Sequence, residues 1–145
     1  MRKKAAGQDV PWETAVVVGA GMAGLLAAAA LSDYFKKVVV IDRDTLPARP
    51  ELRRGVPQGA HVHTIMGLAV ENCDKIIPGM IQRLYEAGAV PIRRNYDIWF
   101  HDMAGPTPIR DVGILTPAVT RPLLEHVTRN LVTQKPNVTL RDKTR

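Results

Sequence analysis

The chain has 145 residues, 46% of them hydrophobic, and a formal net charge of +6. That length supports one domain with a buried core, and no apolar run approaches the ~20 residues of a membrane-spanning helix, so stable membrane insertion is not expected. The single cysteine, Cys73, excludes an internal disulfide and is expected in the core, within a reducing, cytoplasmic setting. Basic residues are dispersed and not interleaved with aromatic side chains, so we expect no nucleic-acid partner.

The first predicted element is a strand over residues 14–18. Residues 1–13 before it carry basic side chains but no apolar stretch, so we expect a disordered tail and not a secretory signal. The domain is then expected to occupy residues 14–145. Four consecutive hydrophobic residues in the strand predict burial on both faces, as in a parallel sheet.

Three glycines follow this strand in the pattern G-x-G-x-x-G, at Gly19, Gly21 and Gly24. In a strand–turn–helix that holds a dinucleotide, the first glycine allows the tight turn. The second lets the backbone approach a pyrophosphate, and the third lets the helix pack closely on the strand. The N-terminus of the next helix, predicted from Met22 to about Tyr34, would face the diphosphate. The alternative is a buried unit with a glycine-rich turn and no ligand.

A second strand is predicted over residues 37–41, parallel to the first through a right-handed crossover, and it is followed by Asp42. An acidic residue about 20 positions beyond the glycines, at the tip of the second strand, is where a ribose diol is held. Strand, glycines, helix and carboxylate together predict the dinucleotide-binding βαβ unit of a Rossmann-like α/β fold.

The following segment, residues 43–60, is aperiodic and contains three prolines and two glycines, so we expect a functional or disordered loop. Residues 61–77 are predicted as a helix that Pro78-Gly79 ends, and residues 80–87 as a second, shorter helix. These two helices would add a helical segment to the Rossmann-like unit.

The last third of the chain combines extended and helical patterns. Alternation over residues 95–101 predicts a strand, a turn follows at 104–106, and residues 107–112 could pair back to form a β-hairpin. Residues 120–122, Thr-Arg-Pro, open another predicted helix, because proline suits the first helical turn. Residues 138–140 are predicted to form a third parallel strand.

Four blocks of sequence carry a family resemblance and together span nearly the whole chain. They are residues 17–26, 40–43 and 53–63, with a weaker block at 120–125 that is followed by 136–140. The sequence resembles the FAD-binding end of flavin-dependent monooxygenases of the p-hydroxybenzoate hydroxylase superfamily. The first block is shared with many NAD and FAD proteins. The third is the discriminating one, since it resembles an R-x-G-V-P-Q-x-x-H-x-H pattern typical of one branch of FAD-dependent oxidoreductases.

The resemblance implies FAD as cofactor, NAD(P)H as co-substrate, and hydroxylation or epoxidation of an organic substrate with O₂. Asp42 would bind the adenosine ribose, where the family often has glutamate, and Arg43 would flank the adenine or ribose. Arg53 and Gln58 would lie toward the flavin, and Arg121 would contact the ribityl or phosphate portion. The glycine-rich turn would wrap the pyrophosphate through Gly19, Ala20, Gly21, Ala23 and Gly24.

The polar positions each have a simpler interpretation. Arg43 and Arg53 could be solvated surface charges, and Arg121 could be only a helix-start residue. His61 and His63 have an i, i+2 spacing that invites a metal, but no carboxylate or cysteine cluster accompanies them. We therefore expect no metal site, and we expect these histidines to cap or line the next helix.

Two features of the family are missing from the sequence: the later G-D segment that contacts the nucleotide, and the downstream sheet that covers the isoalloxazine. We therefore expect an incomplete domain, the N-terminal part of an FAD/NAD(P)-binding domain whose remainder is missing or supplied by a partner chain. Three functions stay open. They are an FAD-dependent oxidoreductase acting on a small-molecule substrate, a non-catalytic dinucleotide-binding module, and an inactive fragment that needs a partner.

Overall fold

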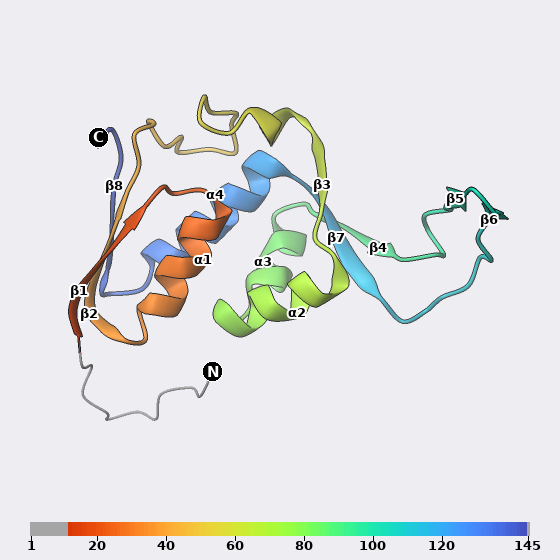
Figure 1. Ribbon diagram of the computed structural model, residues 1–145, viewed down its shortest axis with the longest axis horizontal. Helices are drawn as coiled ribbons and strands as arrows, with labels where there is room; N and C mark the ends of the chain where they lie inside the picture. The colour runs from red at the N-terminus through yellow and green to blue at the C-terminus, as the bar shows by residue number, and fades with distance from the viewer. Residues whose placement is uncertain (1–11, 145) are drawn as a thin grey trace.

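A parallel sheet of three strands forms one end of the molecule in the computed structural model, which describes residues 12–144 (Figure 1). Its strands are β1 (Trp12–Val18), β2 (Phe35–Ile41) and β8 (Val138–Arg141), in the order β1-β2-β8. Both strand pairs are parallel. The predicted third parallel strand is therefore confirmed. Most of the predicted tail lies outside the described residues, and its last two residues, 12 and 13, begin β1.

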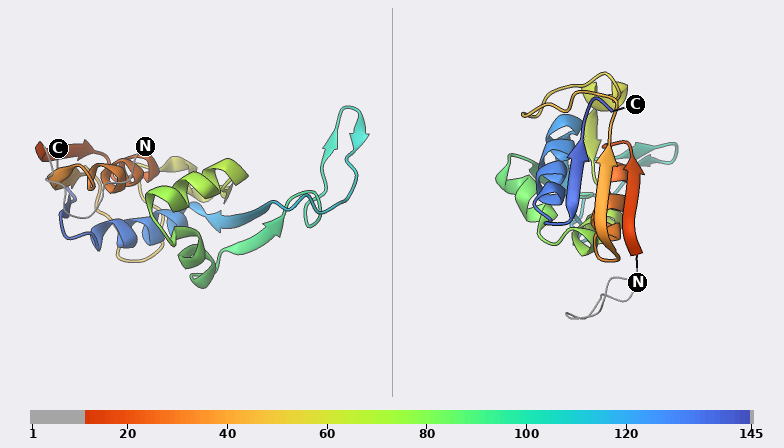
Figure 2. Two further views of the ribbon diagram at one scale, coloured as in Figure 1. Left: turned by 90° about the horizontal axis from the view of Figure 1, so that it is seen from below. Right: turned by 90° about the vertical axis from the view of Figure 1, so that its left-hand side faces the viewer.

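Two helices cover the same face of this sheet, α1 (Met22–Leu31) and α4 (Arg121–Thr133). The right-hand view of Figure 2 shows the three strands in front and these helices behind them. Helix α1 buries Leu25, Ala28 and Ala29, whose small or compact side chains let the helix lie close to the strands. It ends three residues earlier than the predicted Tyr34.

Burial within the sheet alternates along β1, contrary to the prediction that both faces are covered. Val17 pairs with Val40 and both are buried, whereas Val16 and Val18 are 61% and 82% exposed. The physical reason is that both helices pack on one side. Four consecutive hydrophobic residues correctly indicated a parallel strand, but they did not indicate that helices would cover only one face of the sheet.

A second sheet, absent from the sequence prediction, lies beside the helices. It consists of β3 (Val62–Thr64), β7 (Leu115–Thr120) and β4 (Val90–Arg93), in the antiparallel order β3-β7-β4. Val62 pairs with Thr120, far away in the sequence. Local propensity does not reveal such short, non-local strands, because their partner supplies the stabilising contacts.

The predicted helix over residues 61–77 is wrong in its first third. A 3₁₀ turn, η1 (Pro57–Ala60), leads into β3, and helix α2 spans only Gly67–Ile76. Pro78-Gly79 ends that helical region as expected, and α3 (Met80–Glu86) follows. Met80 and Leu84 of α3 are fully buried in the core that both sheets share with α1 and α4.

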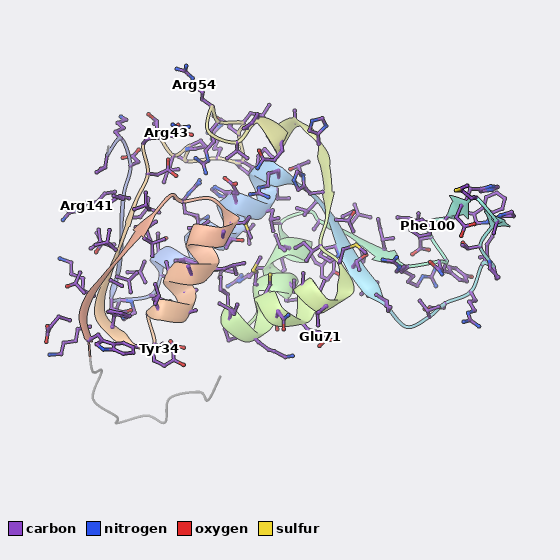
Figure 3. All side chains as sticks on the ribbon, viewed as in Figure 1. Tyr34, Arg43, Arg54, Glu71, Phe100 and Arg141 are labelled. Carbon is purple, nitrogen blue, oxygen red and sulfur yellow. The ribbon has the colours of Figure 1, made fainter. Side chains whose placement is uncertain are left out.

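An extended arm, residues 94–114, joins β4 to β7 and projects away from the body (Figures 1 and 2). It contains a small antiparallel hairpin of β5 (His101–Asp102) and β6 (Gly105–Pro106). A hairpin in this region is thus confirmed, but its predicted strands are wrong: each has only two residues, and β6 lies within the predicted turn at 104–106 and not over residues 107–112. Phe100, which Figure 3 labels, belongs to this arm.

Candidate functional site

The glycine-rich turn between β1 and α1 has the backbone geometry that its spacing predicts. Gly19 has φ +97°, a left-handed conformation that side chains disfavour. A Cβ on Gly24 would lie 1.8 Å from the Gly19 carbonyl oxygen, so only glycine fits there. The N–H of Gly19 donates to the Ile41 carbonyl at 2.7 Å and ties the turn to the end of β2.

Asp42 follows β2 and directs its carboxylate at this turn. Its Oδ2 accepts a hydrogen bond from the Ala20 N–H at 2.6 Å, and its Oδ1 accepts from the Asp44 N–H at 2.9 Å. The residue is only 7% exposed. The sequence therefore placed this carboxylate correctly at the tip of the second strand and beside the glycines.

Arg53 joins the loop after β2 to three acidic side chains. Its Nη1 donates to Asp42 Oδ2 at 3.4 Å and to Asp44 Oδ2 at 2.9 Å, and its Nε donates to Glu125 Oε2 at 3.0 Å. Burial alone would lower the pKa of Arg53, but the hydrogen bonds and negative charges of these partners raise it overall. The simpler interpretation of Arg53 as a solvated surface charge is wrong, because its side chain is only 8% exposed.

Asp44 fixes the conformation of the same loop by contacting both Arg53 and the backbone of Gly55. Its Oδ2 accepts from the Gly55 N–H at 2.7 Å, and a Cβ on Gly55 would lie 2.3 Å from that oxygen. This backbone hydrogen bond is the main cause that lowers the pKa of Asp44; burial opposes it, and the hydrogen bond and charge of Arg53 assist. The loop predicted as functional or disordered is thus a set conformation held by buried charges.

Helix α4 presents three charged residues to this loop, four positions apart: Arg121, Glu125 and Arg129. The helix starts where the Thr-Arg-Pro sequence predicted, and Thr120 is its N-cap, with the hydroxyl accepting from the Leu123 N–H at 3.4 Å. Arg121 Nε donates to Glu125 Oε1 at 2.9 Å. Arg129 is buried and donates to the Pro47 carbonyl; desolvation lowers its pKa.

A groove with a volume of about 1410 Å³ opens at the carboxyl ends of β1 and β2, over the glycine turn and the loop. Parallel sheets bind ligands at this end of their strands. Arg54, on the rim, points away from the body in Figure 3. Seven of the predicted cofactor-binding residues line the groove: Gly19, Gly21, Asp42, Arg43, Arg53, Gln58 and Arg121.

The other three predicted turn residues do not line it. Ala20 has a fully buried side chain and contributes its N–H to Asp42, Ala23 is exposed, and Gly24 serves the packing of helix on strand. Which residues touch a cofactor stays a prediction for all ten positions.

The histidines and the cysteine fall outside the groove. His63 Nδ1 lies 2.8 Å from the His61 carbonyl, and within residues 12–144 no group of three potential metal ligands comes together. Cys73 lies in the core on α2, where burial, assisted by the charge of Asp74, raises the pKa of its thiol.

Sequence reasoning missed three charged residues that hold the loop: Asp44, Glu125 and Arg129. The i, i+4 spacing of Arg121 and Glu125 on a predicted helix was an available signal. Nothing local indicated that the same carboxylate would also meet Arg53, 72 residues earlier.

The structure has a Rossmann-like α/β fold with a groove at the carboxyl ends of its parallel strands. Residues 17–65 match the family described as "NAD(P)-binding Rossmann-like domain". A curated relative, Protein Rv3254 of Mycobacterium tuberculosis, is 38% identical over 95 residues, which are 66% of this chain and 20% of the relative. The chain thus spans about a fifth of the length of that relative.

Solved structures with this fold include a protein in complex with FAD and a halogenase, which confirms the resemblance at the level of fold. CtdE, solved in complex with FAD, has a TM-score of 0.56 at 18% identity, over 92% of this chain and 30% of its own. The halogenase PltM has a TM-score of 0.51 at 15% identity, over 92% of this chain and 28% of its own. The described residues contain no helix long and apolar enough to cross a membrane.

Proposed function

We propose that this protein is the FAD-binding part of a flavin-dependent oxidoreductase. The observation that carries the proposal is the pairing of Asp42 with the glycine turn, where a strand-ending carboxylate lies 2.6 Å from the Ala20 N–H. In dinucleotide-binding folds such a carboxylate holds the ribose diol next to the turn that receives the pyrophosphate. The relation in fold to CtdE, solved with FAD, supports FAD as the dinucleotide.

The residues present fit such a cofactor. A Cβ on Gly19 would meet nothing within 4 Å, and a Cβ on Gly21 would meet only Arg53 Nη2, at 3.8 Å. Gly21 is the N-cap of α1 and forms no side-chain cap, so the positive end of this helix faces the open side of the turn. Arg43, Arg53 and Arg121 would add positive charge for a diphosphate along the same groove.

The reaction class we propose is monooxygenation of a small organic molecule with NAD(P)H and O₂. Support comes from the likeness of residues 53–63 to the monooxygenase pattern. Bound FAD would supply the redox chemistry, while the residues described here bind and orient its adenine diphosphate half.

Reconstitution with FAD tests the proposal. The purified protein is incubated with FAD, freed of unbound cofactor by gel filtration, and assayed for NAD(P)H oxidation in air. A yellow protein that oxidises NAD(P)H supports a flavin oxidoreductase, and formation of a hydroxylated or epoxidised product supports a monooxygenase. A protein that never retains FAD overturns the proposal.

A second candidate is a dinucleotide-binding module without catalysis, alone or with a partner chain. The observation in its favour is that the groove residues described above belong to the turn, the loop or the start of α4, and most of them would serve the adenine diphosphate half. Titration with FAD, ADP and NAD separates the candidates. Tight FAD binding without NAD(P)H oxidation, even with a partner chain added, favours the module.

A further inference from the structure

Glu125 lies between two of the arginines that line the groove, Arg53 and Arg121, and contacts both with one carboxylate. Its Oε1 accepts from Arg121 Nε at 2.9 Å and its Oε2 from Arg53 Nε at 3.0 Å. Its side chain is 5% exposed, against 8% for Arg53 and 17% for Arg121. A single buried carboxylate therefore sets the orientation of two guanidinium groups that come from different segments of the chain.

The contacts determine which edge of each guanidinium stays available. Glu125 takes the Nε edge of both arginines, and the carboxylates of Asp42 and Asp44 take Nη1 of Arg53. Nη2 of Arg53 is left beside the glycine turn, near the position of a Cβ on Gly21. Arg121 is held by its Nε alone among the described contacts, and it lines the same groove. Both arginines thus keep terminal N–H donors for an anion.

We propose that Glu125 is a positioning residue that aims Arg53 and Arg121 at the diphosphate of the bound dinucleotide. This inference rests on the proposed function and adds a residue that does not itself touch the cofactor. Planar guanidinium groups bind phosphate oxygens best when their orientation is fixed in advance, because less side-chain freedom is lost on binding.

The sign of the effect distinguishes positioning from simple electrostatics. A carboxylate near an anion site repels the anion, so removing its charge should tighten the binding of FAD if charge alone mattered. Positioning predicts the reverse. Gln in place of Glu has one acceptor oxygen instead of two, so at least one guanidinium loses its contact with residue 125. Arg121 has no other partner among the described contacts, whereas Arg53 keeps Asp42 and Asp44.

The test compares E125Q with E51Q. Glu51 lines the same groove, is exposed, and makes no ion pair among residues 12–144, so E51Q removes an equal charge without disturbing an arginine. We expect E125Q to bind FAD about tenfold more weakly than wild type, the loss of about one charge-assisted hydrogen bond. E51Q should bind FAD equally or slightly more tightly.

A second readout separates positioning from a general loss of structure. If Glu125 acts through the diphosphate, the preference of the protein for ADP over AMP should fall toward one in E125Q and persist in E51Q. A merely structural role would weaken the binding of both nucleotides together and leave their ratio unchanged. The unfolding midpoint of each variant without ligand is recorded alongside.

If E125Q does not fold, R121K replaces it. The matched control is R83K, because Arg83 pairs with Glu86 at the surface and does not line the groove. Lysine keeps the charge but has no second donor edge once it pairs with Glu125, so R121K should bind FAD several-fold more weakly while R83K stays at the wild-type value. FAD binding by E125Q or R121K at wild-type strength overturns the role of Glu125 alone. Failure of wild type to bind FAD, ADP or NAD overturns the proposed function as well.

Discussion

The N–H of Ala20 and the carboxylate of Asp42 are joined across 2.6 Å, although 22 residues separate them. This contact connects the turn after the first strand to the tip of the second. Asp42 also accepts from the Asp44 N–H and contacts Arg53, so one buried carboxylate organises the turn and the loop together.

Replacement of Asp42 by asparagine should lower both stability and dinucleotide affinity. The amide keeps the size of the side chain but lacks the charge that pairs with Arg53 and can no longer offer two acceptor oxygens. We expect a loss of about 1–3 kcal/mol in the free energy of unfolding, measured by urea denaturation. The control is E13Q, because Glu13 pairs with Lys36 at the surface. For E13Q we expect a loss of about 1 kcal/mol or less in the free energy of unfolding. Equal losses in both variants would contradict the structural role of Asp42.

Alanine at Gly24 and at Gly21 should have opposite consequences. At Gly24 the added Cβ would overlap the Gly19 carbonyl oxygen, so G24A should unfold at a lower temperature, with a cost of about 3 kcal/mol or more. Gly21 has φ −77° and only Arg53 Nη2 near an added Cβ. G21A should therefore fold normally and bind FAD more weakly, because its methyl group occupies the space left for the pyrophosphate. Thermal melts and FAD titrations of the two variants check the contrast.

Asp44 should make stability depend on pH in the acid range. Its pKa in the folded protein is lowered from the usual 3.8, chiefly by the Gly55 N–H. The stabilisation is therefore fully present above the pKa of the unfolded chain and is lost as pH falls toward the pKa of the folded state. The D44N variant should show a flatter loss of stability below about pH 4. Unfolding midpoints measured from pH 6 to pH 3 test this, and curves parallel to wild type would contradict it.

The thiol of Cys73 should react slowly while the protein is folded. Its side chain is buried on α2, and burial raises its pKa, so little thiolate is exposed to reagents at neutral pH. A disulfide reagent with a coloured leaving group should label it far more slowly in buffer than in denaturant. Equal rates would place Cys73 outside the core.

The sequence predicted the glycine turn, Asp42, α4 and the third parallel strand because each has a strong local signal. Regular glycine spacing, a strand-ending carboxylate and a proline suited to the first helical turn are all visible within a few residues. The second sheet lacked such signals, since β3 has three residues and pairs with a strand more than fifty positions away. Histidines 61 and 63 were assigned to a helix for the same reason.

The residues of the candidate site also differ in how far the sequence could identify them. Arg53 and Arg121 were identified from the resemblance, but their common partner Glu125 was not, because the contact depends on how the loop returns to α4. The expected incomplete domain stays a prediction, and the chain spans about 20% of its curated relative.

Contacts within the protein hold the loop over residues 43–60 in one conformation. Arg53 anchors it to Glu125, Asp44 holds the Gly55 backbone, and Arg129 grips the Pro47 carbonyl. Under the proposed function, little of the interaction energy of the cofactor would be lost in ordering this loop, and the association rate should depend on diffusion and charge and not on loop folding.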